Sequence, residues 1–272
     1  MANFRRIIFL LLTIFPILSG SNPMLTGLLG AGGACYPLSA SWTPRFANLG
    51  GYWKLDETAA TAGANNDFTD SSGNNLFGEQ ATGGLTYAAT GKMQNAIGMD
   101  GSNDGVIFGN VLNMGSANFS VSAWVKTTSN VVGINRNGIV YKKTTAAIAD
   151  AGYRLSLPNG QLSFRIGNGT SGLEVNSVRT GLNDDKWHFV VGVRDSGFIR
   201  IYIDGALDSS LAETIGNIDT TTVLAIGGLA TTATAITFQP YLGQIDEVAI
   251  WQRALTREEI KTIYDQQSCG QN

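Results

Sequence analysis

The sequence predicts an all-β protein: an antiparallel two-sheet β-sandwich with one short C-terminal helix. Short segments alternate apolar and polar residues, which is typical of strands with one buried face. Glycine, asparagine and aspartate separate these segments, and such turn residues favour hairpins. The regular alternation of strands and helices that builds a parallel sheet is absent from the sequence. With 34 glycines among 272 residues and only 14% charged residues, the composition resembles that of many exported β-proteins.

Residues 1–21 have the three parts of a secretory signal peptide. Arg5 and Arg6 precede an apolar run from Ile7 to Leu18, and small residues follow it. The run is shorter than the about 20 residues that a transmembrane helix needs. We therefore expect cleavage after Ser21 and a secreted, extracellular or cell-surface location; an uncleaved N-terminal anchor is the alternative.

The rest of the chain divides into an N-terminal arm or linker over residues 22–50 and one large domain over residues 51–272. Cys35 and Cys269 flank this domain, and in an oxidising compartment they are expected to form a disulfide. Closing so long a loop contributes about 4–5 kcal/mol in the chain-entropy description. The alternative is lipidation of Cys35, which leaves Cys269 without a partner.

The segment 119–127, "FSVSAWVKT", alternates with a period of two and has one apolar face. In the segment 153–166, Asn159-Gly160 predicts a tight hairpin turn. The residues expected to face the core on its two arms are Tyr153, Leu155, Leu157, Leu162, Phe164 and Ile166.

Three further strands and one helix follow. Residues 187–205 repeat the hairpin pattern, with a bend at residues 195–197, and "VLAIGG" and "YLGQIDEVAIW" are two more strands. In residues 254–267, Thr256 stands three positions before Glu259, which is a capping box at the start of a helix. Leu255, Ile260 and Ile263 are expected to form the apolar stripe of this helix.

Eight segments then follow one another in a familiar order over residues 51–267: "GYWKLDE", "DSSGNN", "AIGMDGSNDGVIFG", "FSVSAWVKT", "GYRLSLPNGQLSFRIGNG", "LNDDKWHFVVGVRD", "IRIYIDGAL" and "YLGQIDEVAIWQRALTREEI". Together they resemble the laminin-G-like, concanavalin A-like jelly-roll domains of lectins, glucanases and other secreted proteins. The resemblance implies two antiparallel sheets packed face to face. It leaves function open, because members of this fold bind glycans, adhere, dock proteins or support a catalytic domain.

The resemblance also implies a calcium ion at the edge of the sandwich. The positions that match its ligands are Asp70, Asn75 and Asp246, and calcium favours such hard oxygens. The alternative is that Asp70 caps a turn and that Asp246 pairs with an arginine or with backbone amides. Because Asp246 and Glu247 are consecutive in a strand, we expect them on opposite faces, at least one of them toward solvent or a loop.

An enzyme is not expected. Glucanases of this fold carry a Glu-x-Asp-x-Glu type motif in the corresponding strand, whereas Gln244 and Val248 stand where its two glutamates belong. His188 is the only histidine, and we expect it to be packed with its ring nitrogens satisfied locally. One histidine and two distant cysteines do not make a zinc site.

The polar side of the 153–166 hairpin is the predicted ligand surface. Arg154 and Arg165 share that side with Ser156 and Ser163, and an ordinary solvated face is the alternative. Loops carrying Asn103, Asp104 and Asn168 are expected to rim it, because amide and charged groups suit contacts to sugar hydroxyls or acidic groups. Trp53, Trp124, Trp187 and Trp251 are expected in the core, and Trp42 is the freest tryptophan.

Charge limits the possible partners. The formal net charge is −3, and it becomes −5 when Arg5 and Arg6 are removed with the signal peptide. No basic cluster stands out, so nucleic-acid binding is not expected. The sequence therefore favours a non-catalytic, lectin-like or adhesin-like module for a glycan or other cell-surface ligand. The alternative is a structural subunit that docks a protein partner or forms a homo-oligomer.

Overall fold

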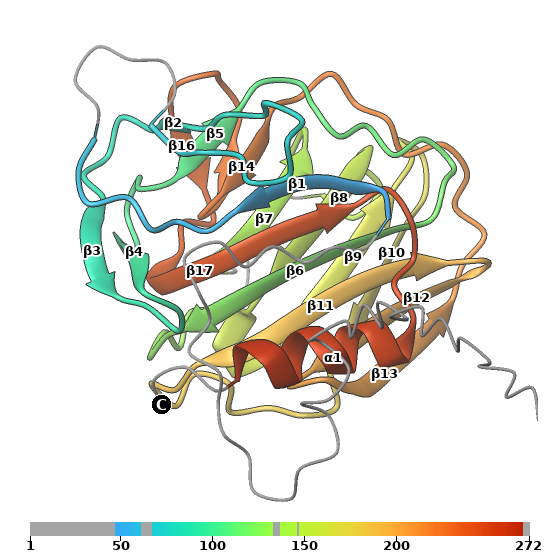
Figure 1. The fold of residues 1–272 in the computed structure, drawn as a ribbon. Coiled ribbons are helices and arrows are strands. Elements are labelled where there is room, and N and C mark those ends of the chain that lie inside the picture. The colour runs from blue at the N-terminus through green and yellow to red at the C-terminus, as the bar shows by residue number, and fades with distance from the viewer. Residues whose placement is uncertain (1–46, 61–66, 133–136, 146, 269–272) are drawn as a thin grey trace, which may run out of the picture. The chain divides into compact units, whose positions relative to one another are not determined.

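Two antiparallel sheets packed face to face make up the fold, and one helix lies outside one of them (Figure 1). The structure is a computed structural model and describes residues 47–60, 67–132, 137–145 and 147–268. The predicted all-β sandwich with one short helix is confirmed. The predicted signal peptide, Cys35, Cys269 and Trp42 lie outside the described residues, as does all but the end of the predicted arm.

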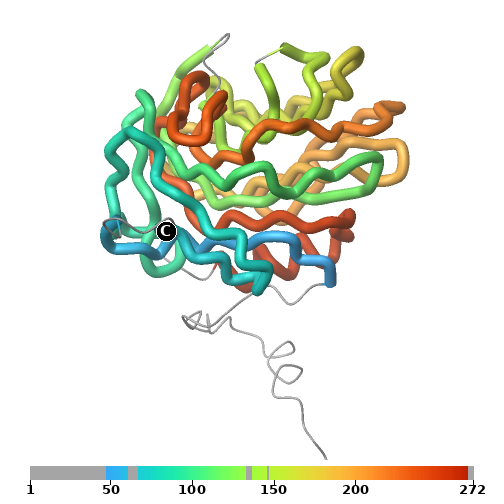
Figure 2. The backbone as a smooth tube through the Cα atoms, turned by 90° about the horizontal axis from the view of Figure 1, so that it is seen from above, coloured from blue at the N-terminus to red at the C-terminus, as the bar shows by residue number. Residues whose placement is uncertain are grey.

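The first sheet has eight strands and contains the first and the last strand of the domain. Its order is β13 (Ala206–Ala212), β12 (Phe198–Ile203), β11 (His188–Asp195), β6 (Phe119–Lys126), β17 (Leu242–Trp251), β4 (Asn95–Asp100) and β3 (Thr86–Thr90). The eighth strand, β1 (Leu49–Trp53), pairs with β17. Figure 2 shows these blue and red segments in the same layer.

The second sheet has seven strands. Its order is β10 (Gly172–Asn176), β9 (Ser163–Gly167), β8 (Gly152–Ser156), β7 (Gly138–Lys143), β14 (Leu224–Ile226), β5 (Val106–Phe108) and β2 (Glu79–Gln80). A separate hairpin of β15 (Leu229–Ala230) and β16 (Ile236–Phe238) follows β14.

The main core lies between the two sheets, as the strand alternation predicts. All six residues predicted to face it from the 153–166 hairpin are buried there. Phe119 of β6 contacts Phe164 of β9 with the ring centroids 5.8 Å apart, which joins the two layers. At the hairpin turn, Asn159 and Gly160 have φ angles of 46° and 70°, the left-handed values that the sequence predicts.

The outward face of the eight-stranded sheet is buried as well. Helix α1 (Arg257–Gln267) lies across it (Figure 1), and Ile260 and Ile263 pack against Trp124 and Phe189. The two-sided burial of β6 therefore differs from the one-sided alternation expected from its sequence. The predicted capping box is present, because Thr256 accepts from the Glu259 amide and the Glu259 side chain accepts from the Thr256 amide.

No helix in the described part of the chain has the length and apolarity that crossing a bilayer requires.

Candidate functional site

The predicted ligand surface forms one row across the seven-stranded sheet, but it is not exposed. Tyr141, Arg154, Arg165 and Glu174 are direct neighbours on β7, β8, β9 and β10. Arg154 and Arg165 point away from the core, as predicted, because their chain neighbours face it. However, Arg154 is 0% and Arg165 2% exposed. The prediction of a solvent-facing surface was therefore wrong.

A carboxylate that the sequence reading did not include explains this burial. Arg165 binds Glu174 through Nε at 2.7 Å and through Nη2, and the Ser163 hydroxyl donates to Glu174 at 2.7 Å. Burial by itself raises the pKa of Glu174, but Ser163 and both arginines outweigh it and lower the pKa to about 2. Glu174 lies opposite Arg165 in the register, which is the signal that could have indicated it.

The three loop residues predicted to rim this surface are not brought together. Asp104 precedes β5 and accepts a hydrogen bond from the Asp100 amide at 2.9 Å, and Asn103 precedes it in the same loop. Asn168 follows β9, and its side chain caps its own turn by accepting from the Thr170 and Ser171 amides. The register places the start of β5 and the end of β9 at opposite ends of the sheet. A shared site with Arg154 is therefore contradicted.

The three predicted calcium ligands are not gathered into one site either. Asp70 pairs with Trp53 on one edge of β1, whereas β17, which carries Asp246, lies on the other edge. Both oxygens of Asp70 accept hydrogen bonds, from the Tyr52, Ser72 and Leu76 amides and from the Ser72 hydroxyl. Asp70 thus caps a turn, and Asn75, with a φ of 59°, belongs to that turn.

Asp246 and Glu247 lie on the same side of the sheet, not on opposite faces. Glu247 has a φ of 53°, and a bulge shifts the register between Asp246 and Ala249. Asp246 is directly opposite Trp124, on the side of α1. On that side Glu247 accepts hydrogen bonds from the Tyr52 hydroxyl and from the Gln267 amide.

Both of these carboxyls are buried. The expectation that one of them faces solvent was therefore wrong. Asp246 is 0% and Glu247 2% exposed, and burial raises the pKa of both carboxyls. Asp246 accepts from the Met93 amide at 3.0 Å through Oδ2, while its Oδ1 has no hydrogen-bond partner. That oxygen fits a cation ligand. In the described part of the chain, no three His, Cys, Asp or Glu side chains converge on a metal position.

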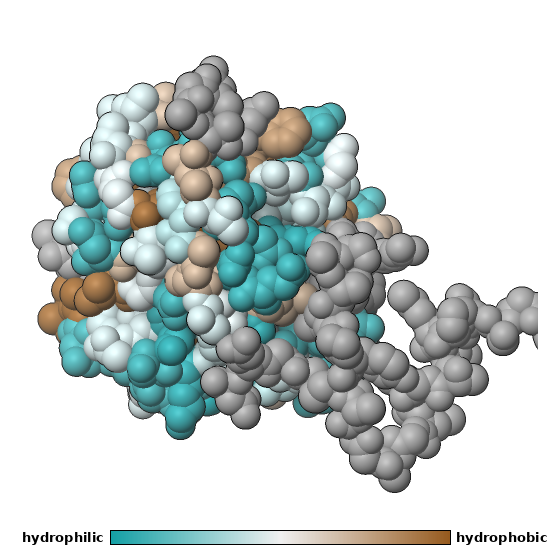
Figure 3. All heavy atoms as spheres, turned by 60° about the vertical axis from the view of Figure 1, so that its left-hand side comes forward, coloured by the Kyte–Doolittle hydropathy of each residue, from teal (hydrophilic) through white to brown (hydrophobic). Residues whose placement is uncertain are grey.

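An open hollow of about 360 Å³ lies at the ends of β4 and β6 and the start of β17, on the same side as α1. Its polar lining includes Thr86, Asp100, Lys126, Asp185 and Gln244. Gly98 stands between Thr86 and Gln244 in the register, and its missing side chain leaves this space open. Lys126 and Asp185 form an ion pair of 3.7 Å across it. The surrounding face, with β3 and β4, is mainly hydrophilic or neutral (Figure 3).

Sequence reasoning considered Gln244 only as a replacement for a catalytic acid and did not predict this hollow. The alternation of β17 places Gln244 on the face of Asp246, so the strand pattern carried part of the signal. Asp100 and Asp185 come from other segments, and only the sheet register brings them near Gln244.

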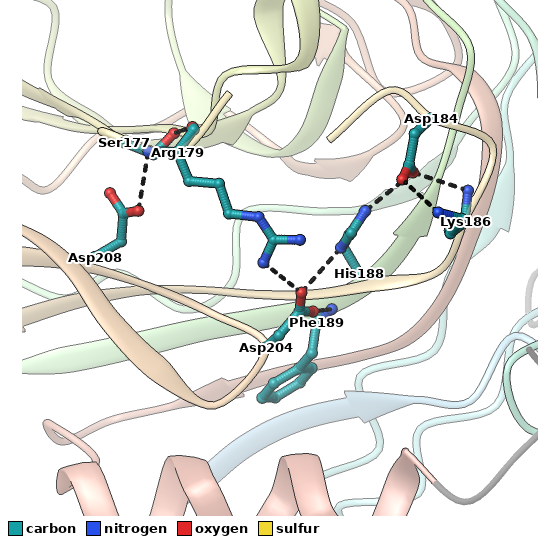
Figure 4. Close-up of polar contacts among 8 residues, drawn as sticks. All are labelled: Ser177, Arg179, Asp184, Lys186, His188, Phe189, Asp204 and Asp208. Atoms are coloured by element: carbon teal, nitrogen blue, oxygen red, sulfur yellow. Dashed lines mark hydrogen bonds and ion pairs between the residues drawn. The ribbon is translucent and has the colours of Figure 1, made fainter. Parts of the chain in front are cut away.

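His188 is packed and satisfied locally, as predicted. Its Nδ1 lies 3.0 Å from Asp204 and its Nε2 3.1 Å from Asp184 (Figure 4). Arg179 approaches Asp204 from the other side and donates to it at 2.7 Å. These contacts tie the loop between β10 and β11 to the turn between β12 and β13 at one end of the sandwich, so His188 has a structural role here.

Comparison with known proteins places the fold. Residues 100–261 match the family described as the concanavalin A-like lectin/glucanases superfamily. The chain belongs to this superfamily. No curated protein matches the sequence significantly.

Solved structures of the same fold include the binding domain of Paraclostridial Mosquitocidal Protein 1, with 16% identity and a TM-score of 0.61 over 80% of this chain. The binding domain of botulinum neurotoxin serotype D has 18% identity and a TM-score of 0.57 over 80% of this chain. The match covers 52% and 50% of those two chains, about half their length.

Domain 4 of AbnA, an extracellular arabinanase from Geobacillus stearothermophilus, was solved in complex with arabinotriose. It shares 20% identity and a TM-score of 0.57 with this superfamily member, and the match covers 80% of this chain and 98% of that domain. At these identities the similarity establishes the fold.

Proposed function

We propose that this superfamily member is a non-catalytic carbohydrate-binding module and that its ligand occupies the hollow at the ends of β4 and β6 and the start of β17. The observation that carries the proposal is the hollow itself. Its volume of about 360 Å³ lies at the lower end of the range typical of small-ligand sites. The arabinanase domain in complex with arabinotriose supports the ligand class. Export, expected from residues 1–21, is part of the same proposal.

The lining suits sugar hydroxyls. Asp100 and Asp185 offer carboxylate acceptors, while Gln244 offers one acceptor and two donors. Hydrogen bonds to a charged group are the stronger ones. Leu242, which is 40% exposed at the rim, provides an apolar surface for the C–H face of a sugar ring.

The acids of β17, the strand that carries the catalytic motif in glucanases of this fold, support a non-catalytic role. Retaining glycoside hydrolysis needs two carboxyl groups about 5 Å apart on either side of the bond that is cleaved. Asp246 and Glu247, the neighbouring acids of β17, are enclosed beneath α1. Gln244, whose amide cannot act as the nucleophile, is the polar residue among the three β17 residues that line the hollow.

Glycan-array binding followed by titration calorimetry tests this proposal. We expect Gln244→Ala and Asp185→Ala each to weaken binding about tenfold or more, because each removes a hydrogen bond worth about 1–3 kcal/mol. Asp265→Ala, which alters an exposed ion pair on α1, is the matched control and should bind like the wild type. Unchanged binding in both hollow variants would refute the location. If the protein cleaved a polysaccharide, it would be an enzyme, and the proposed non-catalytic role would be wrong.

We also propose that Asp246, rather than the predicted trio, is the position for a structural calcium ion, with backbone carbonyls completing the ligands. The support is its buried Oδ1 without a hydrogen-bond partner and the preference of calcium for hard oxygens. We expect a chelator to lower the melting temperature of the wild type but not that of Asp246→Asn. If the chelator leaves the melting temperature of both proteins unchanged, the proposal of a calcium ion at Asp246 is wrong.

A further inference from the structure

One face of β8 carries an unusual concentration of unsatisfied polar atoms. Of the eight buried side-chain nitrogen and oxygen atoms without a hydrogen-bond partner in the described part of the chain, three lie there. They are Nε and Nη1 of Arg154 and the hydroxyl of Ser156. Arg154 and Ser156 are two positions apart in one strand and therefore point to the same side. Both are 0% exposed.

The existing contacts of Arg154 are few and long. Its Nη2 lies 3.3 Å from Glu174 Oε1 and 3.4 Å from the Ser163 hydroxyl. The ring of Tyr141 lies 5.6 Å from the guanidinium carbon and covers one of its faces. Glu174 makes its shorter contacts with Arg165 and Ser163. A buried guanidinium with so little compensation is costly, because buried charges are normally paired and hydrogen-bonded.

Positive charge also exceeds negative charge around Arg154. Lys143 lies on the same side of β7 as Tyr141, the neighbour of Arg154, and donates to the Asp150 carbonyl at 2.5 Å. Burial first, and then the charge of Arg165, lowers the pKa of Lys143 to about 7. Among the described residues, two arginines and a partly charged lysine thus lie near two carboxylates, that of Glu174 and, beside Lys143, that of Asp150. An anion would offset this excess.

We propose that Arg154 and Ser156 bind a small oxyanion, a sulfate, phosphate or carboxylate group, on the outward side of the seven-stranded sheet. The free donors of Arg154 match such a group, and charge-assisted hydrogen bonds to it are strong. The hydroxyl of Ser156 adds a donor. Because both residues are fully buried, the bound group is small: a free ion or an anionic substituent of a sugar. The hollow belongs to the other sheet, so this site is independent of the proposed carbohydrate site.

Thermal unfolding in sulfate or phosphate, against chloride at equal ionic strength, tests the proposal. We compare the wild type with Arg154→Met, which keeps a long side chain without donors, and with Arg257→Met, an exposed control on α1. At saturation, sulfate or phosphate should raise the melting temperature of the wild type and of Arg257→Met by about 2 °C or more. Arg154→Met should show no such rise.

Sodium glucuronate, with glucose as its neutral control, separates the two sources of the anion. A rise with glucuronate as well as with the inorganic ions assigns the site to acidic sugars, and a rise with the inorganic ions alone assigns it to a free ion. An equal rise in Arg154→Met, or no rise with any oxyanion, would overturn the proposal and leave buried water as the partner of these donors.

A measurement on the unaltered protein covers the case in which Arg154→Met does not fold. A buried Nε–H exchanges slowly, so a ¹⁵N spectrum should resolve the signal of Arg154. We expect this signal to shift and saturate as phosphate is added. A signal that stays in place while phosphate reaches concentrations that alter the melting temperature contradicts binding at Arg154.

Discussion

At the scale of single residues, His188 joins two aspartates from different parts of the chain. Its two ring nitrogens contact Asp204 and Asp184, and Asp204 also accepts from the Phe189 amide at 3.0 Å. Burial opposes protonation of His188, but its hydrogen bonds to Asp204 and Asp184 and their charges outweigh burial and raise its pKa. The same contacts overcome burial and lower the pKa of both aspartates.

These shifts predict how stability depends on pH. Because the folded-state pKa of His188 is raised, its contribution is fully present below the unfolded value of about 6.5 and is lost as pH rises through the folded value. The contributions of Asp184 and Asp204 are present above about 3.9 and are lost as pH falls through their lowered values. This network therefore stabilises the fold most between these two limits.

Urea denaturation at about pH 6 and about pH 8.5 checks this expectation. The wild type should lose more free energy of unfolding between the two pH values than His188→Gln does. His188 is the only histidine, and Lys143, with a pKa of about 7, is present in both proteins. The difference between them therefore isolates the histidine. An equal loss in the two proteins would contradict the raised pKa.

Residue-scale predictions from the sequence succeeded where the cause is local. The packing of His188 and the left-handed turn at Asn159-Gly160 were predictable in this way. The burial of Arg154 and Arg165 was not predictable, because it depends on Glu174, which only the pairing of β9 with β10 brings beside them. Asp70 was left with two readings, and the structure has the turn-capping one.

At the scale of elements, the sequence predicted the type of each segment better than its surroundings. The capping box identified the start of α1 because Thr256 and Glu259 are three residues apart. That α1 would cover β6, and so bury both faces of that strand, could not be read from β6 alone. The bulge in β17 escaped prediction for a similar reason. Glu247 is held in its left-handed conformation among Tyr52 and Gln267, which are distant in the sequence.

At the scale of the whole molecule, the two sheets form a sandwich because large buried side chains fill the space between them. Some positions must then remain small. Gly192 of β11 lies opposite Val121, a core residue of β6, and so faces the core. A Cβ atom at position 192 would lie 2.4 Å from Cδ2 of Phe164 in the opposite sheet. Since Phe164 is itself held against Phe119, it has little room to move.

We therefore expect Gly192→Ala to destabilise the protein by about 1–3 kcal/mol, the range for overpacking a filled core. Gly84→Ala is the matched control, because a Cβ at position 84 meets no atom within 4 Å. Alanine also loses less backbone freedom on folding than glycine does, so this substitution is not expected to destabilise the protein. Urea denaturation of the three proteins should give a lowered midpoint for Gly192→Ala alone. If both variants unfolded like the wild type, the sheets would be able to move apart, and close packing between the layers would not be what sets their separation.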